Sequence, residues 1–260
     1  MHPLVNIGVR AARSAGTIIV RALNQLDSLK VTEKSQNDYV TEVDKRAEAE
    51  IIKTIHRAYP NHSIMAEEGG LKKREDEYVW IIDPLDGTTN FLRGIPQFSI
   101  SIAVQHKGEL TAAVIYDPLK DELFTAAKGS GAQLNDRRIR VGTRKDLRGA
   151  LLGTGFPYRD DQSVADYLPT LQALIPGTAG VRRIGSAALD LAYVAAGRFD
   201  GFWEYGLNSW DMAAGVLLVR EAGGVATDAK GGDELFETGD VIAGNIDVHR
   251  EMLSRISKCR

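Results

Sequence analysis

Four carboxylates stand where an expected strand ends or an expected helix begins, at positions Glu67, Asp83, Asp86 and Asp211. Carboxylate oxygens suit Mg²⁺, which takes hard oxygen ligands and keeps several waters. Zinc is a poorer match, because neither a cysteine nor a spaced pair of histidines accompanies these acids. The residue types therefore predict a magnesium site, provided that the fold brings the four acids together.

Each acid alone has a simpler structural interpretation. An aspartate at a strand end is often a turn residue, Glu67 fits a solvated loop, and Asp211 fits the first turn of its helix. Asp44 and Asp190 are interpreted as structural. The combined pattern Asp-Pro-Leu-Asp-Gly-Thr-Thr-Asn over residues 83–90 is explained by no single cap, and it favours a functional site.

The stretch around this pattern predicts a strand followed by a helix. Residues 78–82 are aromatic and β-branched, as in a buried strand, and Pro84 predicts that the strand ends at Asp83. Gly87 allows a tight turn, and either of the two threonines after it can cap the next helix. Carboxylates beside a helix N-terminus can hold a hard cation and a phosphate together.

The elements before and after this stretch predict an α+β first half. Apolar residues recur at helical spacing over residues 3–26 and again after Thr41, an expected N-cap with Asp44 completing a capping box. Alternating segments between residues 63 and 141 predict short strands and a run of antiparallel hairpins, with a charged loop at residues 71–77.

From about residue 150 expected strands alternate with expected helices, as in an α/β fold. No linker, repeat or low-complexity tract separates the two parts. We therefore predict one domain over residues 1–260, with an N-terminal half of about 1–149 and a C-terminal half of about 150–260.

Composition excludes several classes of protein. Hydrophobic residues make up 43% of the 260 residues, which is enough for a sizeable core. The net charge is -3, so free-standing nucleic-acid binding is not expected, although binding within a larger complex is not excluded. The single cysteine, Cys259, forms no intrachain disulfide, and no apolar run approaches membrane-spanning length. These features predict a cytoplasmic protein with no membrane partner.

The chain resembles the inositol monophosphatase family over essentially its whole length. Residues 83–90 resemble the first family signature and residues 210–215 the second, while Glu67, residues 185–188 and Glu204 lie at family-like positions. Residues 35–41 and 185–201 resemble a bacterial branch of the family that includes a ribosomal-RNA transcription antitermination factor.

The resemblance implies a layered αβαβα sandwich of the sugar-phosphatase type. It implies Mg²⁺-dependent, lithium-inhibited hydrolysis of inositol 1-phosphate and related small phosphate monoesters by a metal-activated water. It also implies a homodimer. In the antitermination branch, it implies contact with RNA polymerase and its elongation factors.

The resemblance further assigns roles to individual residues. One ion would be held by Glu67, Asp83 and the Leu85 carbonyl, a second by Asp83, Asp86 and Asp211, and a third, weaker ion would share Glu67. The catalytic residues would be Glu67, Asp83 and Thr88, the last of which orients the water with Glu67. The substrate-binding residues would be Asp86, Gly87, Thr88, Ala187, Glu204 and Asp211.

Two other functions stay open at this point. Fructose 1,6-bisphosphate or a 3′-phosphonucleotide is an alternative substrate, although the compact chain favours small monophosphates. The protein is alternatively a transcription factor first, with phosphatase activity secondary. Arg182 and Arg183 fit either a subunit interface or a solvated pair.

Overall fold

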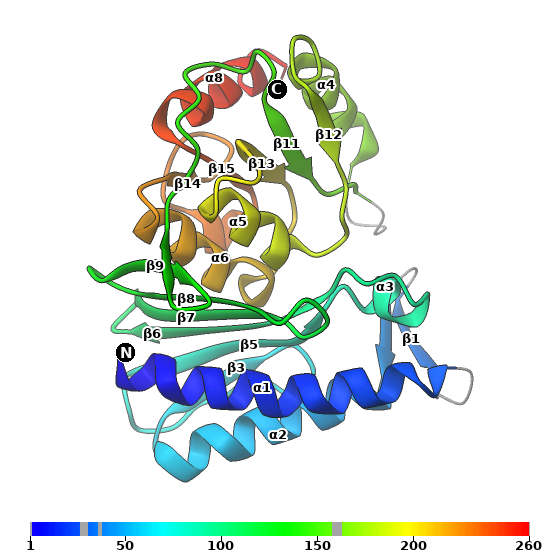
Figure 1. Cartoon of the computed structure of the whole chain (residues 1–260), viewed down its shortest axis with the longest axis vertical. Helices are drawn as coiled ribbons and strands as arrows, with labels where there is room; N and C mark the ends of the chain where they lie inside the picture. The colour runs from blue at the N-terminus through cyan, green and yellow to red at the C-terminus, as the bar shows by residue number, and fades with distance from the viewer. Residues whose placement is uncertain (1, 27–30, 36–37, 158–162, 260) are drawn as a thin grey trace.

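The chain folds into five stacked layers in which helices and sheets alternate (Figure 1). The computed structural model describes residues 2–26, 31–35, 38–157 and 163–259, and for residues 31–35 and 38–40 it describes the backbone only. From bottom to top the layers are α1 (Pro3–Leu23) with α2 (Glu42–Ala58), an eight-stranded sheet, α5 (Ala187–Ala195) with α6 (Ser209–Glu221), a five-stranded sheet, and α4 (Val164–Leu174) with α8 (Ile246–Ile256). This arrangement confirms the predicted αβαβα sandwich.

The large sheet belongs to the first half of the chain and has the strand order β10-β9-β8-β7-β6-β5-β3-β4. Its strands are β3 (Ser63–Ala66), β4 (Gly70–Lys72), β5 (Tyr78–Asp86), β6 (Ser99–His106), β7 (Glu109–Asp117), β8 (Glu122–Ala127), β9 (Gly131–Leu134) and β10 (Arg137–Ile139). All neighbouring pairs are antiparallel except β3 and β5, which are parallel. The run of hairpins is therefore confirmed, whereas the expected loop at 71–77 is partly strand.

The small sheet belongs to the second half and has the order β12-β11-β13-β15-β14. Its strands are β11 (Leu151–Thr154), β12 (Gly180–Arg182), β13 (Gly201–Glu204), β14 (Val225–Thr227) and β15 (Val241–Gly244). β11 runs parallel to β12 and β13, and β15 runs antiparallel to β13 and β14. The alternation of strands and helices thus builds a mixed sheet.

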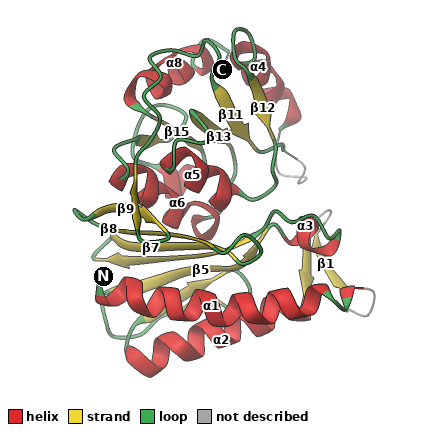
Figure 2. Ribbon diagram, in the orientation of Figure 1, coloured by secondary structure: helices red, strands yellow, loops and turns green. Residues whose placement is uncertain are grey.

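Short elements complete the chain. β1 (Val31–Ser35) and β2 (Asp38–Thr41) form a hairpin before α2, and α3 (Thr88–Leu92) follows β5 (Figure 2). The sequence pattern did not predict α7 (Leu235–Thr238), a helix of a single turn.

Local sequence signals explain where the first helices begin. Pro3 stands at the first position of α1, where a missing backbone N–H costs nothing. The side chain of Thr41 accepts hydrogen bonds from the first turn of α2, and the Asp44 carboxylate accepts from the Thr41 backbone N–H. The predicted capping box is therefore confirmed.

Three apolar cores lie between the described layers. The first joins α1 and α2 to the large sheet and includes Trp80 and Ile82. The second surrounds α5 and α6 between the two sheets and includes Ile81. The third joins the small sheet to α4 and α8 around Trp203. Each sheet is packed against helices on both faces, and this packing fixes the position of one sheet relative to the other.

Gly215 of α6 provides a test of this packing. A methyl group built on it would come within 2.4 Å of the Cβ atom of Leu191 on α5. In an open helix a glycine-to-alanine change stabilises by about 1 kcal/mol. Here we expect Gly215→Ala to lower the free energy of unfolding by about 1–3 kcal/mol, because the buried neighbour has no room to move. Urea unfolding followed by circular dichroism measures the change, and a gain in stability would contradict the close packing.

Candidate active site

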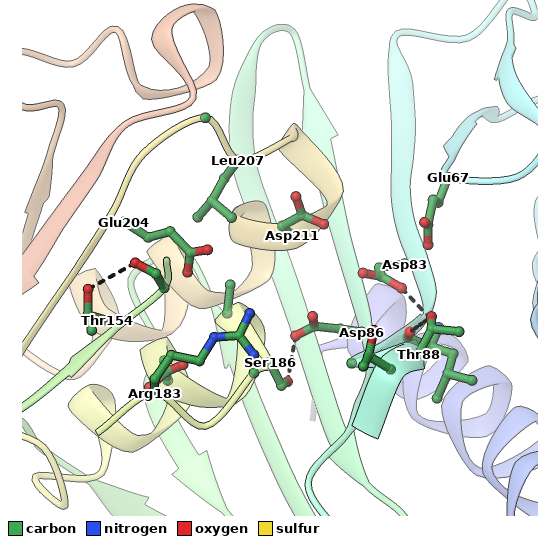
Figure 3. Close-up of a pocket in the computed structure, with 18 of the residues that line it drawn as sticks. Glu67, Asp83, Asp86, Thr88, Thr154, Arg183, Ser186, Glu204, Leu207 and Asp211 are labelled. Atoms are coloured by element: carbon green, nitrogen blue, oxygen red, sulfur yellow. Dashed lines mark hydrogen bonds between the residues drawn. The ribbon is translucent and has the colours of Figure 1, made fainter. Parts of the chain in front are cut away.

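A cavity of about 470 Å³ lies where the large sheet, the small sheet and the first turns of α5 and α6 meet (Figure 3). Residues from both halves of the chain line it. All the residues predicted for the site line it, namely Glu67, Asp83, Leu85, Asp86, Gly87, Thr88, Ala187, Glu204 and Asp211. The structure therefore brings the predicted set together in one place.

Asp83 and Asp86 share this cavity because β5 carries an extra residue between them. Side chains alternate between the two faces of a strand, so residues three apart point to opposite faces. In the pairing of β5 with β6, Asp83 is opposite Ser101 and Asp86 is opposite Ser99. Three steps along β5 thus match two steps along β6, and this bulge returns Asp86 to the face of Asp83.

The packing of the neighbouring residues agrees with the bulge. Ile81 packs in the core beside α5 and α6, whereas Ile82 packs in the core beside α1 and α2. In an unbroken strand Leu85 would share the face of Ile81, yet it packs beside α1 and α2. The expected strand end at Asp83 is therefore wrong, because Pro84 falls within a bulge, where no ladder hydrogen bond is required of it.

Asp83 is the most enclosed of the four acids, with 2% of its surface exposed. Its Oδ1 atom accepts a hydrogen bond of 2.9 Å from the Leu85 backbone N–H. Burial raises the pKa of Asp83 well above its ordinary value, and the charges of Glu67, Asp86 and Asp211 raise it further. All four acids therefore interact electrostatically at this one point.

Asp86 connects the two halves of the chain. Its Oδ2 atom accepts hydrogen bonds from the Ser186 hydroxyl at 2.6 Å and the Ala188 backbone N–H at 2.8 Å, both at the start of α5. Burial raises the pKa of Asp86 to about 6, although these hydrogen bonds oppose the shift. The Ala187 N–H, predicted to bind a substrate hydroxyl, also lowers the pKa of Asp86.

Thr88 does not cap α3 as expected, because Gly87 is the N-cap, with φ at 97°, and no side chain caps the helix. The Thr88 hydroxyl lies 3.1 Å from both the Asp44 Oδ1 atom and the Leu85 carbonyl oxygen, so it donates to one of them at a time. Because the hydroxyl proton is donated to one of these oxygens, the Thr88 oxygen can accept a hydrogen bond from a donor in the cavity.

The opposite wall of the cavity comes from the second half of the chain. Glu204, at the end of β13, lies so close to Gly155 that a methyl group there would come within 1.9 Å of the carboxyl group. Arg183 also lines the cavity, and its guanidinium lies 6.0 Å from the centre of the Phe156 ring.

Sequence reasoning assigned purely structural roles to two residues that contribute to the site. Asp44 caps α2 as predicted, but its other carboxylate oxygen contacts Thr88. Asp190 lines the cavity from α5. A signal for Asp190 is present in the sequence, since it is the single charged residue in an otherwise almost entirely apolar helix.

The oxygen donors of the cavity suit a hard cation. Four carboxylates and a backbone carbonyl supply oxygen ligands, and repulsion among the acids is relieved by a cation. Among the described residues, no three acids, histidines or cysteines already form a close metal-binding group, so the side chains would have to draw inward. The chemistry of the set fits Mg²⁺.

Comparison with known proteins defines the class. The inositol monophosphatase family model matches residues 1–259. Nus factor SuhB of Pseudomonas aeruginosa is 54% identical over 98% of this chain and 96% of its own length. A crystal structure of extragenic suppressor protein suhB from Bartonella henselae has a TM-score of 0.96 and 45% identity, covering 99% of both chains. An inositol monophosphatase structure from Anabaena has a TM-score of 0.84 and 40% identity, covering 98% of this chain and 95% of that one.

Fold, acid-lined cavity and relatives place the chain among the phosphatases. Within that class, it belongs to the inositol monophosphatase family. None of the helices that the structure describes is both long and apolar enough to cross a membrane.

The variant Asp83→Asn tests whether burial and repulsion among the four acids destabilise the protein when no ligand is bound. An acid whose pKa is raised on folding stabilises the protein below its unfolded pKa, and that contribution is lost as the pH rises through its folded pKa. The amide keeps the acceptor for Leu85 but carries no charge. We therefore compare the free energies of unfolding of Asp83→Asn and wild type without metal. We expect the difference to shift in favour of Asp83→Asn by about 1 kcal/mol or more between pH 4 and pH 8. Urea unfolding at both pH values measures this, and a pH-independent difference would contradict it.

Proposed function

We propose that the protein hydrolyses small phosphate monoesters with Mg²⁺, and that inositol 1-phosphate is a preferred substrate. The observation that carries the proposal is the gathering of four acids from both halves of the chain around one cavity. Membership of the inositol monophosphatase family supports the choice of substrate. The cavity, at about 470 Å³, has room for a sugar-sized monophosphate.

The residues proposed to hold two or three Mg²⁺ ions are Glu67, Asp83, Asp86, Asp211 and the Leu85 carbonyl. When bound, the ions would supply an acidified water and offset the charge of the phosphate. The chain's own contribution is to keep the acids on one face of β5 and at the start of α6. Asp83 and Asp86 each lose repulsion when a cation is present, so folding and ion binding are coupled.

Thr88 is proposed to orient the attacking water together with Glu67. Its hydroxyl proton is engaged by Asp44 or by the Leu85 carbonyl, so its oxygen can accept the proton of a water. Asp44 is buried, and burial raises its pKa while its hydrogen bonds from Thr41 and Thr88 oppose that shift. Asp44 thereby positions Thr88 and helps to carry the proton away.

The two ends of the substrate are proposed to face different walls. The phosphate would lie near Gly87 and Thr88, which line the cavity beside the acid cluster. The alcohol would face the second wall, with Asp86, Glu204 and Asp211 accepting hydrogen bonds from its hydroxyls. Gly155, which has no side chain, leaves space for the Glu204 carboxyl group there.

Activity assays test this function directly. We expect phosphate release from inositol 1-phosphate only with Mg²⁺, inhibition by lithium, and a loss in kcat of at least about 100-fold in Asp83→Asn and in Thr88→Ala. Asp228→Asn serves as a matched control, because Asp228 is a buried acid in a loop outside the cavity. Turnover of Asp83→Asn at the wild-type rate would refute the ion assignment, and a panel with fructose 1,6-bisphosphate and a 3′-phosphonucleotide tests the alternative substrates.

A second function is favoured by one observation, the 54% identity to a protein named Nus factor over nearly the whole chain. We propose that this protein also takes part in transcription antitermination, through RNA polymerase and its elongation factors and as a homodimer. This role would use the outer surface of the protein, whereas hydrolysis would use the acid-lined cavity. The two roles can therefore coexist in one molecule.

A deletion strain separates the two roles. Asp83→Asn keeps the fold and the outer surface but removes one ligand of the proposed ions, so we expect it to restore ribosomal-RNA transcription to near wild-type level. Read-through of a ribosomal-RNA leader measures the effect. Failure of the wild-type protein to co-purify with RNA polymerase or elongation factors would count against the role altogether.

A further inference from the structure

Asp190 is a buried acid of α5 whose carboxylate the proposed mechanism does not use. Only 1% of its surface is exposed, yet it lines the cavity. Its Oδ1 atom has no hydrogen-bond partner among the described residues. Buried polar groups are almost always hydrogen-bonded, so an orphan oxygen on a residue that lines the cavity points to a partner from outside the chain, either a ligand group or a water.

The backbone around Asp190 is shaped to admit its side chain. A methyl group built on Gly153 of β11 would come within 2.5 Å of the Asp190 Oδ1 atom, so the carboxyl group rests on a bare Cα atom. Two residues further on, Gly155 accommodates Glu204 in the same way. Gly153 in β11 and Gly155 just after its end therefore each have a carboxyl group against them.

The charges facing Asp190 point to a neutral partner. Burial has the largest effect on the pKa of Asp190 and raises it, Glu204 and Asp86 raise it further, and Arg183 lowers it. With two further acids on this side, a phosphate dianion is repelled from Asp190. A hydroxyl group can donate to a carboxylate or accept from a carboxylic acid, so it matches Asp190 in either protonation state.

We propose that Asp190 binds a hydroxyl of the alcohol part of the substrate and selects polyol phosphates over phosphate esters that lack hydroxyls. The inference rests on the proposed phosphatase function and adds a specificity-determining residue to it. A substrate hydroxyl pairs the orphan Oδ1 atom, whereas an ester without hydroxyls leaves the atom unpaired. Sites built to hydrogen-bond a hydroxyl discriminate strongly against analogues that lack it.

The test compares two substrates in three variants of the full-length, Mg²⁺-loaded protein. Inositol 1-phosphate carries hydroxyls on its alcohol, and p-nitrophenyl phosphate carries none. In Asp190→Ala we expect kcat/KM for inositol 1-phosphate to fall by about tenfold or more relative to that for p-nitrophenyl phosphate. Asp190→Asn keeps the shape and an acceptor, so we expect a change in this ratio of about threefold. Asp228→Asn, a buried acid outside the cavity, should leave the ratio unchanged.

A second measurement does not depend on the turnover of a polyol ester. Inositol alone should inhibit the hydrolysis of p-nitrophenyl phosphate by wild type, and about tenfold more weakly in Asp190→Ala. Equal losses for both substrates in Asp190→Ala and in Asp190→Asn, with unchanged inhibition by inositol, would overturn the proposal and make Asp190 a purely structural residue. Failure of the wild-type protein to hydrolyse either ester is a different result, which would overturn the proposed function itself.

Discussion

Repulsion among buried carboxylates is the constraint on which the rest of the structure depends. Asp83 is almost fully enclosed, and three other acids raise its pKa. The hydrogen bond from the Leu85 N–H opposes this rise only in part, so the remaining cost must be offset by burial elsewhere. The three apolar cores on either side of the two sheets provide this burial, and they hold rigid the elements that carry the acids.

The elements that local patterns determine could be predicted from the sequence. The capping box of Thr41 and Asp44 was predicted to the residue, because it depends on neighbours within a few positions. The bulge in β5 was not predicted, since it exists only in the pairing with β6. Pro84 correctly indicated an interruption, but an interruption can end a strand or kink it, and only the partner strand decides.

Some site residues could likewise be predicted from the sequence, and others could not. Recurrent patterns identified the four acids, whereas the roles of Asp44 and Asp190 depend on contacts across the fold. Thr88 lies 44 positions beyond Asp44 in sequence, and Gly153 lies on a different element from Asp190. Such pairs leave no periodic signal. A single acid within an apolar helix is the nearest equivalent, and it marks a residue as unusual without giving its role.

The bulge has a consequence for how this site can change over time. Its extra residue decides on which side of the sheet Asp86 and everything after it will point. Replacing Pro84 or Leu85 alters the turn, but adding or removing one residue there moves a carboxylate from the cavity into the core beside α1 and α2. Between Asp83 and Asp86 the chain can therefore vary in residue identity far more readily than in length, and insertions or deletions at this point are expected to be lost from the lineage.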